Sequence, residues 1–174
     1  MSVTPTNIEW GAGELALSVY PSYDYYDVGA CRNAVFKWQK ITKMIECGQV
    51  GGAVHAVPIR TDGSFKITLL EGTTHNINRA LSSPQSADVY LQDESLVFYR
   101  LIYQVPIKQI GATENVFRIS LYKVFSSEGI QPVLSKSEER SFEITFQVLA
   151  DPLNNNRSGL IQLNVEPLSS QPDS

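Results

Sequence analysis

The chain contains few of the residues from which metal and redox sites are built. Its 174 residues include only two cysteines and two histidines. Cys31 and Cys47 are too far apart for a CxxC motif, and His55 and His75 lack both metal-ligand spacing and an acidic cluster to complete a site. We therefore expect reduced thiols, no bound metal and no cofactor.

Long hydrophobic runs and an excess of basic residues are also missing. No stretch approaches the roughly 18 apolar residues that a bilayer span needs, and residues 1–5 show neither a basic patch nor an apolar run. Lys and Arg number 14 against 18 Asp and Glu, a net charge of -4 that repels phosphate backbones. The sequence predicts a soluble cytosolic protein that binds neither membrane nor specific nucleic acid.

Catalytic patterns are absent as well. No serine lies in a GxSxG elbow, and Gly11–Gly13 precedes a predicted strand instead of opening a helix, which makes it a poor phosphate cradle. Asp24 with Asp27, and Asp93 with Glu94, lie in predicted turns, where solvated charge is the common state of acidic pairs. We predict that the protein is not an enzyme.

What the chain has in quantity is alternation of apolar and polar residues, and 43% of its residues are hydrophobic. Period-two alternation is typical of half-buried strands. It occurs at residues 15–20, 34–45, 53–60, 64–70, 95–105, 117–125, 142–148 and 161–165. This pattern predicts a mainly β fold, a β-sandwich or barrel of about eight strands. We assign residues 1–166 to a single domain and 167–174 to a flexible C-terminal tail.

Glycine-containing segments predict two turns. Asp62-Gly63, between the alternating runs 53–60 and 64–70, predicts a tight hairpin turn. Gly48, Gly51 and Gly52 predict a loop in which the backbone turns sharply or lies close to another surface.

One segment predicts a helix. Ile77, Ala80 and Leu81 recur at helical spacing within residues 75–81, and Thr73 or Thr74 can cap the first turn. A helix of about two turns is too short to be stable alone, so we expect it to pack against the sheet.

A tyrosine-rich segment, residues 20–26, remains to be explained. It holds Tyr20, Tyr23, Tyr25 and Tyr26, interleaved with Asp24. Tyrosine supplies a large amphipathic contact area, so the segment could stack on sugar rings, form a protein contact, or fold back onto the sandwich.

Five segments, in this order, carry a resemblance to a known family: residues 3–11 (VTPTNIEWG), 27–30 (DVGA), 45–50 (IECGQV), 66–71 (KITLLE) and 76–81 (NINRAL). Together they resemble the tail tube (major tail) proteins of long-tailed bacteriophages. The likeness runs over about residues 4–81, and residues 149–161 resemble the closing strands of the family. Between residues 82 and 140 only the strand pattern is shared.

The resemblance implies a structural virion protein of the phage tail, assembled in the cytoplasm of the host bacterium. Copies of such proteins form hexameric rings that stack into a tube, and DNA passes through the lumen without specific binding. Sheath, baseplate and terminator proteins are the possible further partners. The predicted strand 95–105 is apolar on both sides, which fits a second face that meets a neighbouring copy.

Two sets of residues follow as hypotheses. The solvent-exposed polar face of the strand 142–148 would line the lumen, through Glu143, Thr145 and Gln147. The contacts between subunits or rings would involve Tyr23, Tyr25, Tyr26, Gly48, Gln49, Val50, Gly51 and Gly52.

Other functions stay open. A carbohydrate-binding or adhesion β-sandwich would use the tyrosine cluster, and a tail terminator or a type VI secretion tube subunit would share the fold. The sequence leaves undetermined the ring size, the stacking parameters, the presence of a sheath and whether the isolated chain polymerises.

Overall fold

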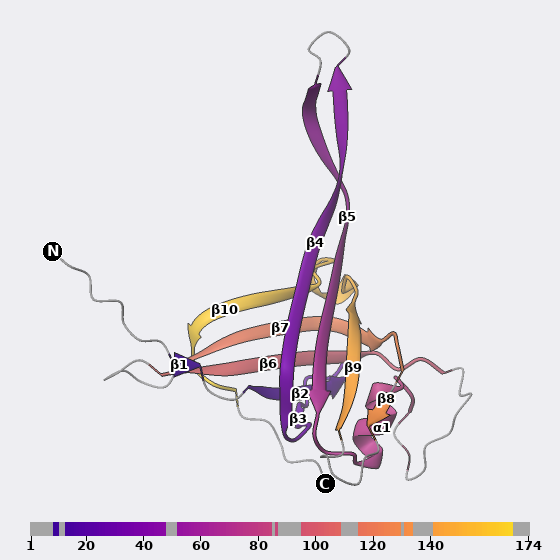
Figure 1. Cartoon of the computed structure of the whole chain (residues 1–174), viewed down its shortest axis with the longest axis vertical. Helices are drawn as coiled ribbons and strands as arrows, with labels where there is room; N and C mark the ends of the chain where they lie inside the picture. The colour runs from indigo at the N-terminus through magenta and orange to yellow at the C-terminus, as the bar shows by residue number, and fades with distance from the viewer. Residues whose placement is uncertain are drawn as a thin grey trace, which may run out of the picture.

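The structure is a computed structural model that describes residues 9–10, 13–47, 52–84, 86, 95–108, 115–129, 131–133 and 141–168 (Figure 1). Its ten strands form one antiparallel sheet. The strands are β1 (Glu9–Trp10), β2 (Glu14–Val19), β3 (Tyr26–Asp27), β4 (Cys31–Cys47), β5 (Gly52–Leu69), β6 (Tyr99–Lys108), β7 (Asn115–Ser126), β8 (Gln131–Val133), β9 (Ser141–Val148) and β10 (Gly159–Val165). The helices are α1 (Thr74–Ala80) and the 3-10 turn η1 (Pro152–Asn154).

The sheet folds over on itself at β7. Its order is β3-β2-β6-β7-β9-β5-β4, with β1 on β6, β10 on β7 and β8 on β9. β7 pairs with β10 through Val116–Leu121 and with β9 through Val124–Ser126, so the sheet divides into two layers at this strand. In Figure 1 the layer of β6, β7 and β10 crosses steeply behind the layer of β4, β5 and β9. The predicted mainly β sandwich with one short α-helix is confirmed.

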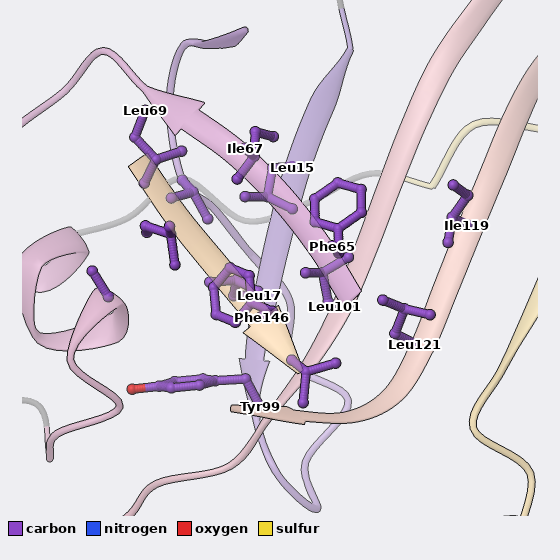
Figure 2. Close-up of a cluster of buried hydrophobic side chains, with 14 of the residues drawn as sticks. Leu15, Leu17, Phe65, Ile67, Leu69, Tyr99, Leu101, Ile119, Leu121 and Phe146 are labelled. Atoms are coloured by element: carbon purple, nitrogen blue, oxygen red, sulfur yellow. The ribbon is translucent and has the colours of Figure 1, made fainter. Parts of the chain in front are cut away.

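The core fills the space between the two layers (Figure 2). The predicted inward face of β5, Phe65, Ile67 and Leu69, is fully buried. Leu17 from β2 and Leu121 from β7 meet it from the other layer. Alternation along residues 64–70 therefore did select the core-facing side of β5, whereas the alternating Ile161 and Leu163 of β10 are exposed.

The predicted helix is confirmed, and its start is a capped one. The Thr73 side chain accepts a hydrogen bond from the Asn76 backbone NH, and its β-region backbone is typical of an N-cap. Ala80 is buried in the core cluster and Ile77 packs against it, so the helix is held by the sheet as expected.

The predicted hairpin turn at Asp62-Gly63 is wrong. Both residues lie inside the continuous strand β5, where Asp62 pairs with Gln39 and Gly63 with Trp38. A Cβ atom at Gly63 would lie 2.5 Å from carbons of the Trp38 indole, so this glycine permits close packing of a ring against the strand. The chain turns between Cys47 and Gly52 instead, which are paired across the two strands.

The expectation for strand 95–105 also needs correction. The observed strand β6 runs from Tyr99 to Lys108, and its second face is buried within the same chain. Arg100, Ile102 and Gln104 on that face are each at most 6% exposed. A neighbouring copy is therefore not needed to cover them.

Three further expectations concern the chain ends, metals and membranes. Of the predicted tail, residues 169–174 lie outside the described residues. The Leu168 backbone is hydrogen-bonded to the Gln104 side chain. In the described part of the chain, no His, Cys, Asp and Glu side chains gather in a group of three that could hold a metal. Within the same residues, no helix has the length and hydropathy of a membrane span.

Candidate assembly surfaces

The outer halves of β4 and β5 project from the sandwich as a two-stranded arm, residues 39–47 and 52–62 (Figure 1). β9 pairs with β5 only from Gly63 to Leu69, so in the described residues of the arm each strand has only the other as a neighbour. A two-stranded ribbon in water is marginally stable at best. The arm therefore gains stability from any surface that covers it.

Exposed apolar side chains occupy both faces of the arm. The cross-strand register puts Ile45 and Val57 on one face and Met44 and Pro58 on the other. Met44 is 61% exposed, and Ile59, at the register shift beside Pro58, is 62% exposed. Large apolar groups gathered on one exposed element mark a surface for another macromolecule.

The predicted contact loop connects the two strands of this arm in the sequence. Because Cys47 pairs with Gly52, the connection between the strands consists of the four residues Gly48, Gln49, Val50 and Gly51. These four lie outside the described residues, and Gly52 begins β5. Their contacts stay a prediction.

The three residues predicted to line a lumen share one face of β9, which we call the polar strip. Glu143 forms a 2.7 Å ion pair with Lys66 of β5. Thr145 is buried and its hydroxyl donates a 2.8 Å hydrogen bond to Glu128, while Gln147 is half-buried opposite Ser64. The strip thus belongs to a polar face that carries cations as well as acids, and its position in an assembly stays a prediction.

The tyrosine segment folds back onto the sandwich by stacking on cations. The Arg100 guanidinium carbon lies 4.1 Å from the ring centroid of Tyr23 and 5.2 Å from that of Tyr20. The Lys123 ammonium lies 4.9 Å from the Tyr20 ring and 4.4 Å from the Phe98 ring. Rings and cations therefore alternate in a stack that fixes the segment on β6 and β7.

A buried ion pair anchors this stack. Arg100 and Asp151 are 1% and 0% exposed, with 3.4 Å between Arg100 Nη2 and Asp151 Oδ2. Arg100 Nε donates to the Pro21 carbonyl at 3.3 Å. Asp151 is also the N-cap of η1, and an Asp directly before a proline is a helix-capping signal in the sequence.

Asp151 is held ionised by a set of donors. Burial, the largest single effect, opposes ionisation, but hydrogen bonds from Asn154, Tyr20 and the Leu153 NH, with the charge of Arg100, outweigh it and lower the pKa of Asp151. The hydrogen bond to Asp151 is the main cause of a raised pKa of Tyr20. The site is therefore a structural clamp between β2, β6 and η1.

Beside the stack is a pocket of about 450 Å³, which we call the tyrosine pocket. Its lining includes three tyrosines, two carboxylates and one amide: Tyr23, Tyr25, Tyr122, Glu14, Asp24 and Gln104. The Gln104 amide donates to Glu14 at 3.1 Å and to the Leu168 carbonyl at 2.9 Å, which fixes the floor. Burial raises the pKa of the half-buried Tyr25.

The tyrosine pocket contains only two of the three tyrosines that were predicted to form contacts between subunits or rings. Tyr23 and Tyr25 line it, whereas Tyr26 is the first residue of β3 and pairs with Leu17. Tyr122 and Gln104 were missed, because nothing in a single strand indicates which loop will cover its polar face. β3 and the far ends of β4 and β5 lie at opposite ends of the molecule in Figure 1, so the two predicted contact regions are separate surfaces.

A second, more apolar hollow lies where the sandwich is open beside the arm. It has a volume of about 430 Å³, and its lining combines the apolar Phe36, Trp38, Leu121 and Ile161 with the polar Asn156, Arg157 and Ser158. Along β10, Ile161 and Leu163 are 53% and 63% exposed. β10 pairs only with β7 among the described strands, so its other edge offers unpaired backbone groups.

Comparison with known protein families finds no match, and comparison with curated proteins finds none either. A solved structure shares the fold. A chain in the six-fold symmetrised cryo-EM structure of the anti-feeding prophage (AFP) baseplate superimposes with a TM-score of 0.54 and 10% sequence identity. The similarity covers 95% of this chain and 98% of that chain, so the common fold extends over almost the whole length of both.

Proposed function

We propose that this chain is a non-enzymatic structural subunit of a phage-tail-like assembly, and more narrowly a tail tube subunit. In this proposal its copies form hexameric rings that stack around a channel for DNA. The protein would reside in the virion tail after assembly in the bacterial cytoplasm.

The arm carries the proposal. Met44 and Ile59 are more than half exposed on a ribbon whose two strands, among the described residues, pair only with each other. Such a ribbon is an aggregation hazard in a protein that works alone, whereas in an assembly it is buried against a neighbour.

The open edge of β10 supports the same conclusion. Exposed Leu160, Ile161 and Leu163 lie on a strand that pairs along one edge only, with β7, in the part of the chain that the structure describes. Pairing of this edge with a strand of another copy would satisfy the backbone groups and cover the side chains, and closure of a ring would remove the free edges.

The fold that this chain shares with a solved structure also supports the proposal. The AFP baseplate chain comes from a six-fold symmetrised particle, and it matches this chain from end to end. Sheath, baseplate and terminator proteins are accordingly the further partners that we propose. We propose that the polar strip faces the lumen through Glu143 and Gln147, while Thr145, expected on the same solvent-exposed face, is buried against Glu128. The mixed charges of the strip would leave DNA without a basic surface to bind.

The experiment is to purify the chain and follow its association with concentration by analytical ultracentrifugation and negative-stain electron microscopy. We expect rings or short tubes with six-fold symmetry. A protein that stays monomeric at the highest soluble concentration, alone and with its baseplate partners, would contradict the proposal.

The tyrosine pocket favours a second candidate, a carbohydrate-binding module. Tyr23 is 64% exposed and carboxylates and an amide lie beside it, a combination that suits stacking on sugar rings with hydrogen bonds to hydroxyls. This candidate predicts a monomer that binds glycans through Tyr23, so a glycan-binding assay on the monomer separates the two functions.

A further inference from the structure

We propose that the tyrosine pocket receives Lys43 from the arm of a second copy of this chain. The inference rests on the proposed self-assembly and deepens it, because it names the two surfaces that meet. The pocket supplies aromatic walls and carboxylates, and the arm supplies an exposed ammonium group with apolar neighbours.

The chemistry of the pocket selects a cation. Tyr23, Tyr25 and Tyr122 contribute aromatic side chains to its lining, and Glu14 and Asp24 contribute carboxylates. No lysine or arginine is among the described residues that line it. Aromatic faces combined with carboxylates are the usual surroundings of a bound ammonium or guanidinium group.

The cations already on this side of the sheet are engaged elsewhere. Arg100 is paired with Asp151 beneath Tyr23, and Lys123 lies between the rings of Tyr20 and Phe98. Arg118 is buried and donates to the Glu166 carbonyl. They stiffen the pocket wall and leave the carboxylate of Asp24 exposed, with only Ser22 as a hydrogen-bond partner among the described residues.

The arm has the complementary charge. Residues 39–62 contain Lys40, Lys43 and Arg60 against Glu46 and Asp62, a net charge of +1 in a chain whose net charge is -4. Arg60 is paired with Asp62 at 3.2 Å. Lys40 and Lys43 are exposed and form no ion pair among the described residues, so they are the cations that an acidic surface can attract.

Position selects Lys43 over Lys40. Lys40 lies opposite Thr61 near the base of the arm, beside the apolar hollow of its own chain. Lys43 lies three residues further out, which is about 10 Å along a strand. It is opposite Val57 and on the same face as Ile45, so its charge lies on a face with apolar side chains that gain from meeting tyrosine rings.

The contact is heterologous, because the arm and the pocket are different surfaces of one molecule. Such a contact repeats from copy to copy and gives closed rings or open filaments, whereas a self-complementary patch would stop at a dimer. This is the geometry that a tube requires.

The test is a charge-reversal cycle read by sedimentation velocity over a range of protein concentrations, with Lys43→Glu, Asp24→Lys and the double variant. Each single reversal should weaken association by at least about tenfold, since like charges meet at the contact, and the double variant should recover most of the loss. Lys37→Glu is the control, because Lys37 lies opposite Ser64 at the base of the arm and far from the proposed contact. It should leave association unchanged.

The outcomes separate the two proposals. If the wild-type protein associates and Lys43→Glu associates equally well, or if the double variant shows no recovery, the assignment of Lys43 to the pocket is overturned while self-assembly stands. If the wild-type protein never associates, both proposals fall. Circular dichroism spectra and melting temperatures of the variants should match those of the wild type, because both side chains are exposed.

Discussion

The Tyr20 hydroxyl donates a 2.8 Å hydrogen bond to the Asp151 carboxylate, between residues 131 positions apart in the sequence. The same carboxylate is paired with the buried Arg100. One acidic side chain thus ties the end of β2, the start of β6 and the turn before β10, and it holds the tyrosine segment in the position where the pocket forms.

Replacing Asp151 by Ala should destabilise the protein by about 3–5 kcal/mol, because it leaves the Arg100 charge buried without a partner. Urea unfolding followed by circular dichroism measures the change. Replacing the pair together, with Arg100→Met and Asp151→Leu, should recover a large part of the loss. Asp62→Asn is the matched control, since its ion pair with Arg60 is exposed to solvent and such pairs contribute at most about 1 kcal/mol.

The free energy of unfolding should decrease at acid and at alkaline pH, because the clamp needs an ionised Asp151 and a protonated Tyr20. The pKa of Asp151 is lowered on folding, so its contribution is present above the unfolded value of about 3.9 and is lost as the pH falls through the folded value. The pKa of Tyr20 is raised, so its contribution is present below about 10 and is lost as the pH rises through the folded value.

Urea unfolding at a series of pH values measures both limbs. Tyr20→Phe should reduce the loss of stability at alkaline pH (the alkaline limb of the curve), and Asp151→Asn should reduce the loss at acid pH (the acid limb). An acid limb that persists unchanged in Asp151→Asn would assign the loss to other carboxylates.

Gly63→Ala should destabilise the protein by about 1–3 kcal/mol, because the added methyl group overlaps the Trp38 ring. A shift in tryptophan fluorescence should accompany it, and Trp38→Leu in the same background should relieve the overlap. Gly72→Ala is a suitable control, since the nearest atom to its new Cβ lies 4.0 Å away. Equal effects at the two glycines would contradict the packing of Trp38 on the strand.

Met44→Asp combined with Ile59→Asp should abolish self-association without lowering the melting temperature of the monomer, because both side chains are already in water. Size-exclusion chromatography with light scattering measures the association. Lys37→Ala, at the base of the arm, serves as the control for a surface change outside the apolar patch. If the double variant assembled as the wild type does, the arm would not be the assembly surface.

Several elements could be predicted from the sequence because their signals are local. Phe65, Ile67 and Leu69 alternate with polar residues, and that period of two fixes which side of β5 enters the core. Thr73 caps α1 because its side chain accepts a hydrogen bond from the Asn76 NH, three residues further along the chain. A capping residue at this spacing can be recognised in the sequence, so the start of the helix was predictable.

The candidate surfaces could be predicted only in part from such local signals. Four tyrosines within seven positions identified a segment with surplus aromatic area, and the glycines before β5 identified a turn. Neither pattern could indicate that Tyr122 and Gln104 would complete a pocket, because those residues come from strands whose partners are set by the fold.

What the sequence alone determined was the period of each strand, the cap of the helix and the absence of catalytic patterns, all properties of residues within a few positions of one another. Only the tertiary structure decided that Asp62-Gly63 continues a strand, because the decisive contact is with Trp38 of the neighbouring strand. Only the tertiary structure brought Arg100 to Asp151 and ended the pairing of β9 with β5 at Gly63, before the arm begins. Long-range pairing depends on the free energy of the whole fold, and no local pattern encodes it.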